Sequence, residues 1–152
     1  MPKKKHTHQY RQPGQQPQPR WQGIEALWTF ATPIDGMLES SQEQYATLQE
    51  AKPKPHVLDD YTVNRVITVF TTQIADLWLF DEQLSRWQAE TLTPEQRTEV
   101  TRLVEQMRRL REVDNQVLAL AKDLSKGTIE KVMKKSDAEV GLEFLMGMFD
   151  KP

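Results

Sequence analysis

The three histidines are the first side chains to examine for chemistry, because imidazole is the usual proton carrier near neutral pH. His6 and His8 lie near the N-terminus, and His56 follows two lysine-proline pairs. None of them falls on a segment that we expect to pack, and the chain has no cysteine. The sequence therefore predicts no catalytic triad, no thiolate chemistry, and no resident metal or cofactor.

Phosphate-binding loops and helical metal sites are missing as well. Neither Gly-x-Gly-x-x-Gly nor Gly-x-x-x-x-Gly-Lys occurs in the chain. The Glu-x-x-His pair that holds di-iron centres in helical bundles is also absent. We therefore expect no small-molecule substrate or nucleotide at such a site.

Two carboxylates remain as the strongest catalytic candidates. Asp81 and Asp114 both fall within apolar stripes, where an unpaired charge is costly. An antiparallel hairpin turning near Leu92 would separate them by about 16 Å along its axis. A direct acid pair is therefore not expected. We interpret each aspartate as the partner of an arginine or as a polar residue that fixes helix register, and a carboxylate-based enzyme is the weakest alternative.

Residues 1–20 differ in composition from the rest of the chain. They are rich in proline and glutamine and contain no acidic residue. Their basic residues are Lys3, Lys4, Lys5, Arg11 and Arg20. Such a segment buries too little apolar surface to offset its ordering entropy, so we expect a disordered basic arm. It provides the alternative function, an accessory factor that binds nucleic acid through the arm.

The second basic cluster is Arg108, Arg109 and Arg111, on a segment that we expect to be helical. Glu105 and Glu112 lie three or four residues away, a spacing at which oppositely charged side chains pair on a helix. Ordinary pairing on the helix surface therefore accounts for most of this cluster.

Hydrophobic spacing places a helical bundle over residues 21–152. Apolar residues spaced three or four positions apart predict a helix from Trp21 to Ala31. Thr32-Pro33 is typical of a new helix start. The helix that follows should end before the prolines of residues 52–55.

An antiparallel hairpin is predicted over residues 57–126. Its first helix has apolar positions from Val63 to Leu84, with all-round apolar character at Leu77–Phe80. Its second helix starts at the capping sequence Thr93-Pro94-Glu95-Gln96. We expect this helix to run for three and a half heptads and to end at Gly127 in a left-handed conformation.

Two short helices are predicted within residues 128–149, the second starting at the capping sequence Ser136-Asp137-Ala138-Glu139. Gly141 and Gly147 weaken that second helix, so it forms only by docking. Docking on this chain's own bundle is favoured over insertion into a partner's groove.

The fold class is thus all-α: a long antiparallel helical hairpin, a third packed helix, short terminal helices and a disordered basic arm. We expect a non-enzymatic interaction protein, meaning a scaffold or accessory subunit that binds a protein partner or a second copy of itself. The expected contact residues are Trp21, Trp28, Trp78, Phe80, Trp87, Phe144, Leu145 and Phe149. No apolar stretch is long enough for a membrane span and no secretory signal is visible, so we expect a cytoplasmic protein.

Overall fold

The computed structural model describes residues 18–149, which contain four long helices and no strand. The helices are α1 (Leu27–Ala51), α2 (Asp60–Gln88), α3 (Pro94–Leu124) and α4 (Ile129–Phe149). Short 3-10 helices precede α1, α2 and α4, namely η1 (Ile24–Ala26), η2 (Pro55–Val57) and η3 (Ser125–Gly127). The predicted all-α class is therefore confirmed. Most of the predicted arm, residues 1–17, lies outside the described residues.

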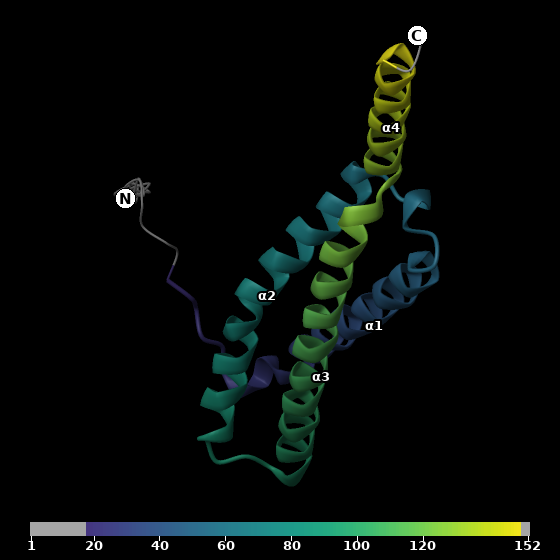
Figure 1. Cartoon of the computed structure of the whole chain (residues 1–152). Coiled ribbons are helices and arrows are strands. Elements are labelled where there is room, and N and C mark those ends of the chain that lie inside the picture. Colours follow the sequence, from purple (N-terminus) through teal and green to yellow (C-terminus); the bar gives the residue numbers. More distant parts are fainter. Residues whose placement is uncertain (1–17, 150–152) are drawn as a thin grey trace, which may run out of the picture.

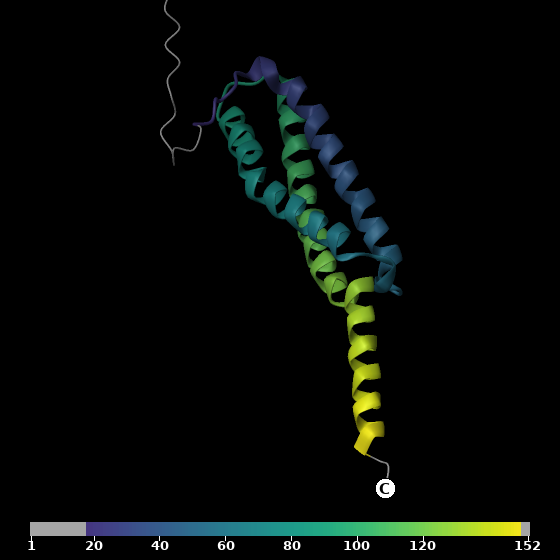
Figure 2. The same cartoon turned by 90° about the horizontal axis from the view of Figure 1, so that it is seen from above.

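Helix α3 is the central element of a three-helix body. Figures 1 and 2 both show α2 on one side of α3 and α1 on the other. The chain runs along α1, returns along α2 and runs forward again along α3, so α2 and α3 form the expected antiparallel hairpin with α1 as the third packed helix. Within residues 18–149, no helix has both the length and the apolar content needed to cross a bilayer.

The buried side chains of α3 follow the predicted seven-residue repeat. They are Val100, Leu103, Met107, Leu110, Val113, Asp114, Val117, Ala121 and Leu124. Only Val113 lies outside the predicted stripe. Because the stripe stays on one face for about seven turns, α3 buries it against α1 and α2 together.

Side chains at the helix starts supply the hydrogen bonds that the first turns lack. Asp59 caps α2, since its carboxylate accepts from the backbone N–H of Thr62 at 2.6 Å. Thr93 and Gln96 form a reciprocal capping box at the start of α3. The start of α3 agrees with the sequence expectation.

The predicted break at Thr32-Pro33 is wrong, because α1 continues through Pro33. The phase of the apolar positions does not change at the proline: Leu27 lies before it and Ile34 after it, and both are fully buried. Burial of each side chain stabilises by about 1.5–3 kcal/mol. Together these contributions offset the roughly 3 kcal/mol that an internal proline costs.

Gly127 does not adopt the left-handed conformation that we expected of a helix C-cap. Glycine is needed at this position for a steric reason. A Cβ atom at this position would lie 2.9 Å from Cγ of Pro55, so the close approach of the turn before α2 selects glycine.

Candidate interaction surface

Helix α4 projects beyond the three-helix body. Figures 1 and 2 show it continuing past the end of α3, with none of the other long helices beside it. The break between α3 and α4 at η3 is short, so the two helices run in nearly the same direction. Every side chain of α4 that the structure describes is exposed.

Two predictions for the C-terminal region are therefore wrong. Residues 129–149 form one helix, not two, because Ser136 and Asp137 continue it instead of capping a new one. The sequence favours docking on the chain's own bundle, but within residues 18–149 the hydrogen bonds and ion pairs that join α4 to the rest of the chain all lie in its first turn. Beyond that turn the helix extends past the body, so none of the other described long helices lies beside its apolar residues.

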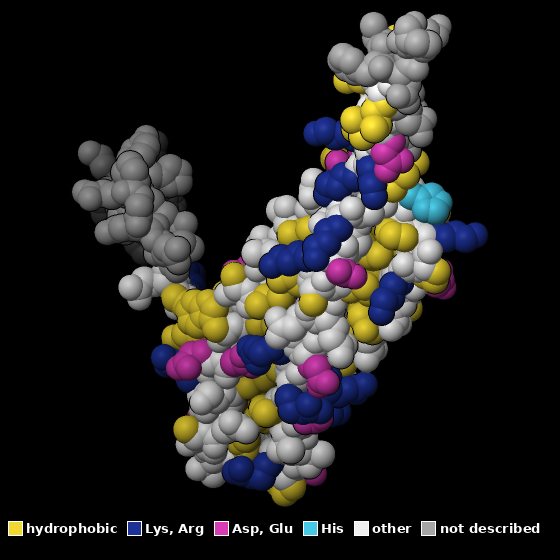
Figure 3. Space-filling model, in the orientation of Figure 1, with side chains coloured by type: hydrophobic (Ala, Val, Ile, Leu, Met, Phe, Trp, Pro, Cys, Tyr) yellow, Lys and Arg dark blue, Asp and Glu magenta, His cyan; other side chains and the backbone are white. Residues whose placement is uncertain are grey.

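The exposed apolar side chains of α4 are large. Phe144 is 69% exposed and Leu145 is 54% exposed. The others are Val132, Met133, Leu142 and Met146. Figure 3 shows hydrophobic side chains on this helix, beside lysines at its base. Phe149 ends the helix, but its side chain lies outside the described part of the chain. Contiguous apolar surface on a soluble fold typically marks an interaction site.

The base of α4 is fixed to the start of α2. The backbone N–H of Ile129 donates to the carbonyl oxygen of Leu58 at 2.8 Å. The Asp60 carboxylate accepts from the Thr128 hydroxyl at 2.6 Å and lies 3.7 Å from the Lys131 ammonium. The Glu130 carboxylate accepts in turn from the backbone N–H of Asp60. These contacts set the direction of α4 without covering its length.

A second apolar region surrounds the N-terminal segment of the described chain. Trp21 stacks edge-on against Trp78 with ring centroids 6.4 Å apart, and the Arg86 guanidinium lies over the Trp21 ring. Trp78 is half exposed. Beside them is a pocket of about 320 Å³, with Arg20, Leu79 and Phe80 among its lining residues. Trp21 and Trp78 thus lie together, as a small aromatic patch.

The other expected aromatic contacts divide between core and surface. Trp87 is fully buried, stacks on Phe30, and donates its indole N–H to the carbonyl oxygen of Gln22, so its assignment to a partner surface is wrong. Phe80 also stacks on Phe30 and is largely internal, and Leu77 is buried. Within the expected apolar belt Leu77–Phe80, Leu77 is thus buried, Trp78 is half exposed, and Leu79 and Phe80 are partly buried. Trp28 remains exposed on α1.

Sequence reasoning missed the side chain that positions the N-terminal segment. Gln83 is buried on α2, where its amide oxygen accepts from the backbone N–H of Gln22 at 2.6 Å. Its amide nitrogen donates back to the Gln22 carbonyl oxygen. No spacing signal distinguishes Gln83 from the exposed glutamines of the chain, because its role depends on a contact 61 residues away.

The two candidate acids lie in different environments and do not form a pair. Asp81 forms an ion pair with Arg111 at the half-exposed surface of the hairpin. Asp114 is fully buried, accepts from the Gln73 amide at 2.7 Å, and keeps Oδ1 without a hydrogen-bond partner. Gln73 also donates to Ser41. Asp114 thus belongs to a polar layer with one side chain from each body helix, as expected of a register-fixing residue.

Burial raises the pKa of the Asp114 carboxyl above its ordinary value, and the neighbouring Ser41 and Gln73 side chains oppose that shift only in part. Hydrogen bonds from Arg102 lower the pKa of Asp35, the residue that joins α1 to α3. The Asp35 carboxylate shares the Arg102 guanidinium with the Glu99 carboxylate. Among residues 18–149, no group of three histidines or carboxylates is placed to hold a metal ion.

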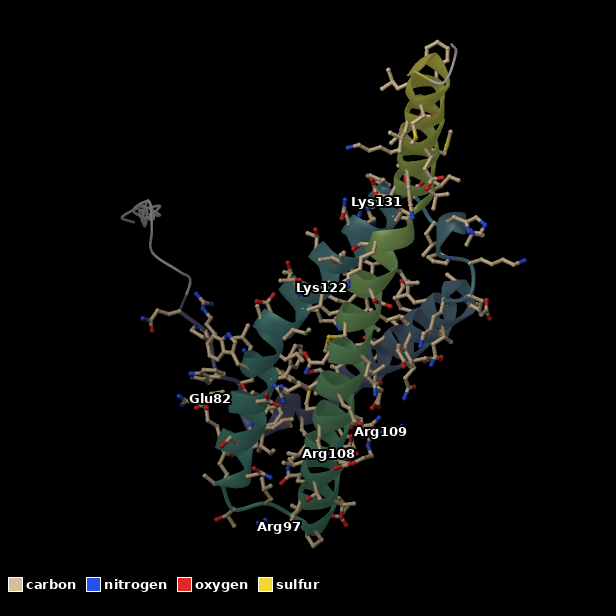
Figure 4. The ribbon with its side chains drawn as sticks, in the orientation of Figure 1. Glu82, Arg97, Arg108, Arg109, Lys122 and Lys131 are labelled. Atoms are coloured by element: carbon tan, nitrogen blue, oxygen red, sulfur yellow. The ribbon has the colours of Figure 1, made fainter. Side chains whose placement is uncertain are left out.

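Five basic side chains of the body form ion pairs, namely Arg86, Arg102, Arg108, Arg111 and Lys126. Arg108 donates to Glu105 and Glu112 on the outer side of α3, where Figure 4 also places Arg109. The expected helix-surface pairing is thus confirmed for Arg108, whereas Arg109 donates to the Gln106 amide oxygen and Arg111 pairs with Asp81 on α2. Of the predicted arm residues, Arg20 is exposed at the aromatic patch. Lys3, Lys4, Lys5 and Arg11 lie outside the described residues.

Comparison with known proteins gives no functional assignment. No protein-family model, curated protein or solved structure matches this chain. The argument for function therefore rests on the exposed apolar helix α4 and on how the body holds it.

Proposed function

We propose that this chain is a non-enzymatic interaction protein, a helical scaffold or accessory subunit that offers α4 to a protein partner. The observation that carries the proposal is the apolar surface of α4, which is exposed along a helix extending away from the body. A partner that covers this surface would remove it from water at a gain of roughly 25 cal/mol per Å².

The energetics of α4 also support a partner. A helix without tertiary packing is only marginally stable in water. Gly141 and Gly147 each cost about 1 kcal/mol relative to alanine in a helix interior, and neither has a described neighbour that a Cβ atom would touch. Contacts from outside this chain would supply the stabilisation that the body does not.

The body suits the role of a presenting platform. Its core spans all three helices, and the base of α4 is tied to α2 through Asp60 and Thr128. An attachment of this kind holds the contact helix in a defined direction, which lowers the ordering entropy lost on binding.

Site-specific photo-crosslinking in cells tests the proposal. A photoreactive amino acid replaces Leu145 on α4 or, as the matched control, Glu95, which is exposed at the far end of the body. We expect Leu145 to give one adduct of fixed mass with another polypeptide chain, and Glu95 to give none.

Adding Phe144→Ser to the Leu145 probe should abolish the adduct while leaving the circular dichroism of the body unchanged. Crosslinks from position 145 that run only to this chain's own α1–α3 body would contradict the proposal, because they would mean that α4 folds back in solution.

The second candidate function is nucleic-acid binding through the arm. The charge distribution favours it: residues 1–20 hold five basic groups, whereas all 22 acidic groups lie elsewhere. Counterion release from such an arm predicts binding to DNA or RNA that weakens steeply with salt. Filter binding with the full chain and with a chain lacking residues 1–20 checks this, and equal affinities for both would exclude the arm.

A further inference from the structure

The apolar residues of α4 include a stripe with an internal symmetry. Positions 129, 133, 140 and 144 fall on one helix face, because their spacings of four and seven residues match the helical repeat. All four positions carry large apolar residues: isoleucine, methionine, valine and phenylalanine. Positions 129 and 144 are equally distant from the point between Ser136 and Asp137, and so are positions 133 and 140.

This symmetry matches an antiparallel pairing of α4 with a second α4. A two-fold axis near residues 136 and 137 would place Ile129 opposite Phe144 and Met133 opposite position 140, so that apolar residues meet apolar residues at each level. A two-fold contact of this kind uses the same surface patch on both copies.

The charges near the centre of α4 have opposite signs on the two sides of the midpoint. Lys134 and Lys135 lie on one side of the midpoint, and Asp137 and Glu139 lie on the other. All four side chains are exposed, and none forms an ion pair within the described residues. An antiparallel pair brings the lysines of each helix beside the acids of the other, whereas a parallel pair in register would bring lysine to lysine.

The position of α4 leaves room for this arrangement. Because the helix extends beyond the body in both views, two bodies would lie at opposite ends of the paired segment. The segment 129–144 is about 24 Å long at 1.5 Å per residue. Leu142 and Leu145 fall outside the symmetric stripe, so they would stay available for a further contact.

We propose that two copies of this chain associate through α4, as an antiparallel helix pair centred on residues 136 and 137. This inference rests on the proposed function, since it names the partner that covers the same helix. A two-helix contact of this length is smaller than a standard protein interface. The association should therefore depend on concentration, with a dissociation constant on the order of micromolar.

Sedimentation equilibrium of the full chain over a wide concentration range measures this association. The mass should rise from 17.7 kDa towards twice that value. Met133→Glu with Phe144→Glu should keep the chain monomeric at every concentration, because it places a carboxylate against an apolar residue at both levels of the stripe. Val69→Glu, at an exposed apolar position of α2, is the matched control and should leave the dissociation constant within about twofold.

Charge reversal tests the orientation. Lys134→Glu with Lys135→Glu should weaken association by about tenfold, and the further changes Asp137→Lys with Glu139→Lys should restore it. Because the chain has no native cysteine, Ser136→Cys near the axis should oxidise to a covalent dimer, whereas Phe144→Cys should not. Disulfide dimers formed by the single variant Phe144→Cys would indicate a parallel pair, because only then does residue 144 lie beside its own copy. That result would overturn the proposal.

The outcomes separate this inference from the proposed function. A chain that stays monomeric at high concentration, but whose position 145 crosslinks to a different protein, overturns self-pairing and leaves the interaction function standing. A monomer in which position 145 crosslinks only to its own body overturns both.

Discussion

Helices α3 and α4 are adjacent in sequence and nearly collinear, yet they have opposite relations to solvent. Helix α3 buries one continuous stripe between α1 and α2. In α4, by contrast, every described side chain is exposed, although apolar residues are more frequent there than in α3. The amount of apolar sequence therefore does not decide burial in this chain.

The phase of the apolar residues is what differs. In α3 they return to one face every third or fourth residue, so two neighbouring helices cover all of them. In the second half of α4 they surround the axis, so no single neighbour in the same chain covers them. A helix of the first kind completes a core, and a helix of the second kind needs contacts from more than one side.

The largest expected difference between the two helices is in stability. Leu110→Ala on α3 removes a fully buried side chain and should lower the free energy of unfolding by about 2–5 kcal/mol. Leu145→Ala on α4 should change it by less than about 0.5 kcal/mol. Urea unfolding of both variants checks this. A loss of more than 2 kcal/mol for Leu145→Ala would mean that α4 is buried in solution.

The buried polar layer of the body predicts a pH effect of intermediate size. Because burial raises the pKa of Asp114 in the folded state, the folded chain holds its proton at pH values where the unfolded chain has lost it. Stability should therefore fall as pH rises from the unfolded pKa, near 3.8, through the raised folded value, and should stay lower above it.

Asp114→Asn keeps an acceptor for Gln73 and removes the charge. It should stabilise the chain by about 1–3 kcal/mol at pH 8 and by almost nothing at pH 4. Unfolding by urea at several pH values measures this. Equal stabilisation at both pH values would show that ionisation of Asp114 is not the cause.

Two glycines give a smaller pair of opposite effects. Gly127→Ala should destabilise by about 1 kcal/mol or more, because the added Cβ atom meets Pro55 at 2.9 Å. Gly141→Ala has no described neighbour within 4 Å and should raise helicity, with a gain of about 0.5–1 kcal/mol for α4. Thermal unfolding and circular dichroism at 222 nm check the two variants. A destabilising Gly141→Ala would reveal a close neighbour at that position.

The smallest expected effect comes from the ion pair between Asp81 and Arg111. Both side chains are about 40% exposed, so solvent screens their attraction. Asp81→Asn should cost about 0.2–1 kcal/mol at low salt, and less at 1 M salt. A double-mutant cycle with Arg111→Met gives the coupling energy, and a value above about 2 kcal/mol would place the pair in a drier site than the structure describes.

Much of the body could be predicted because its determinants are local or periodic. The Thr93 capping box needs only residues 93–96, and the α3 stripe needs only the spacing from Val100 to Leu124. The interpretation of Asp81 and Asp114 as structural residues also followed from spacing, since a turn near Leu92 keeps them apart. Partner contacts at Phe144 and Leu145 stay a prediction, now with exposed side chains to support them.

The errors share a physical cause, which is that a distant contact outweighed a local signal. Thr32-Pro33 is typical of a helix start, but the stripe shared with α3 carries α1 through it. Tryptophan is a residue type enriched at interfaces, but Trp87 is buried against Phe30 and donates its indole N–H to the Gln22 carbonyl oxygen. Gln83 gave no signal at all, because its partner is 61 residues away.

The sequence by itself determined the two helices of the hairpin, the cap at Thr93 and the buried stripe of α3, because hydrogen bonding within a helix and the 3.6-residue repeat act over a few residues. Only the tertiary structure decided which aromatic side chains became core and that the described side chains of α4 stay exposed. Those outcomes depend on how far the body extends in space. Helix α4 extends past the body from its base beside the start of α2. Its exposed apolar side chains therefore meet solvent instead of the core.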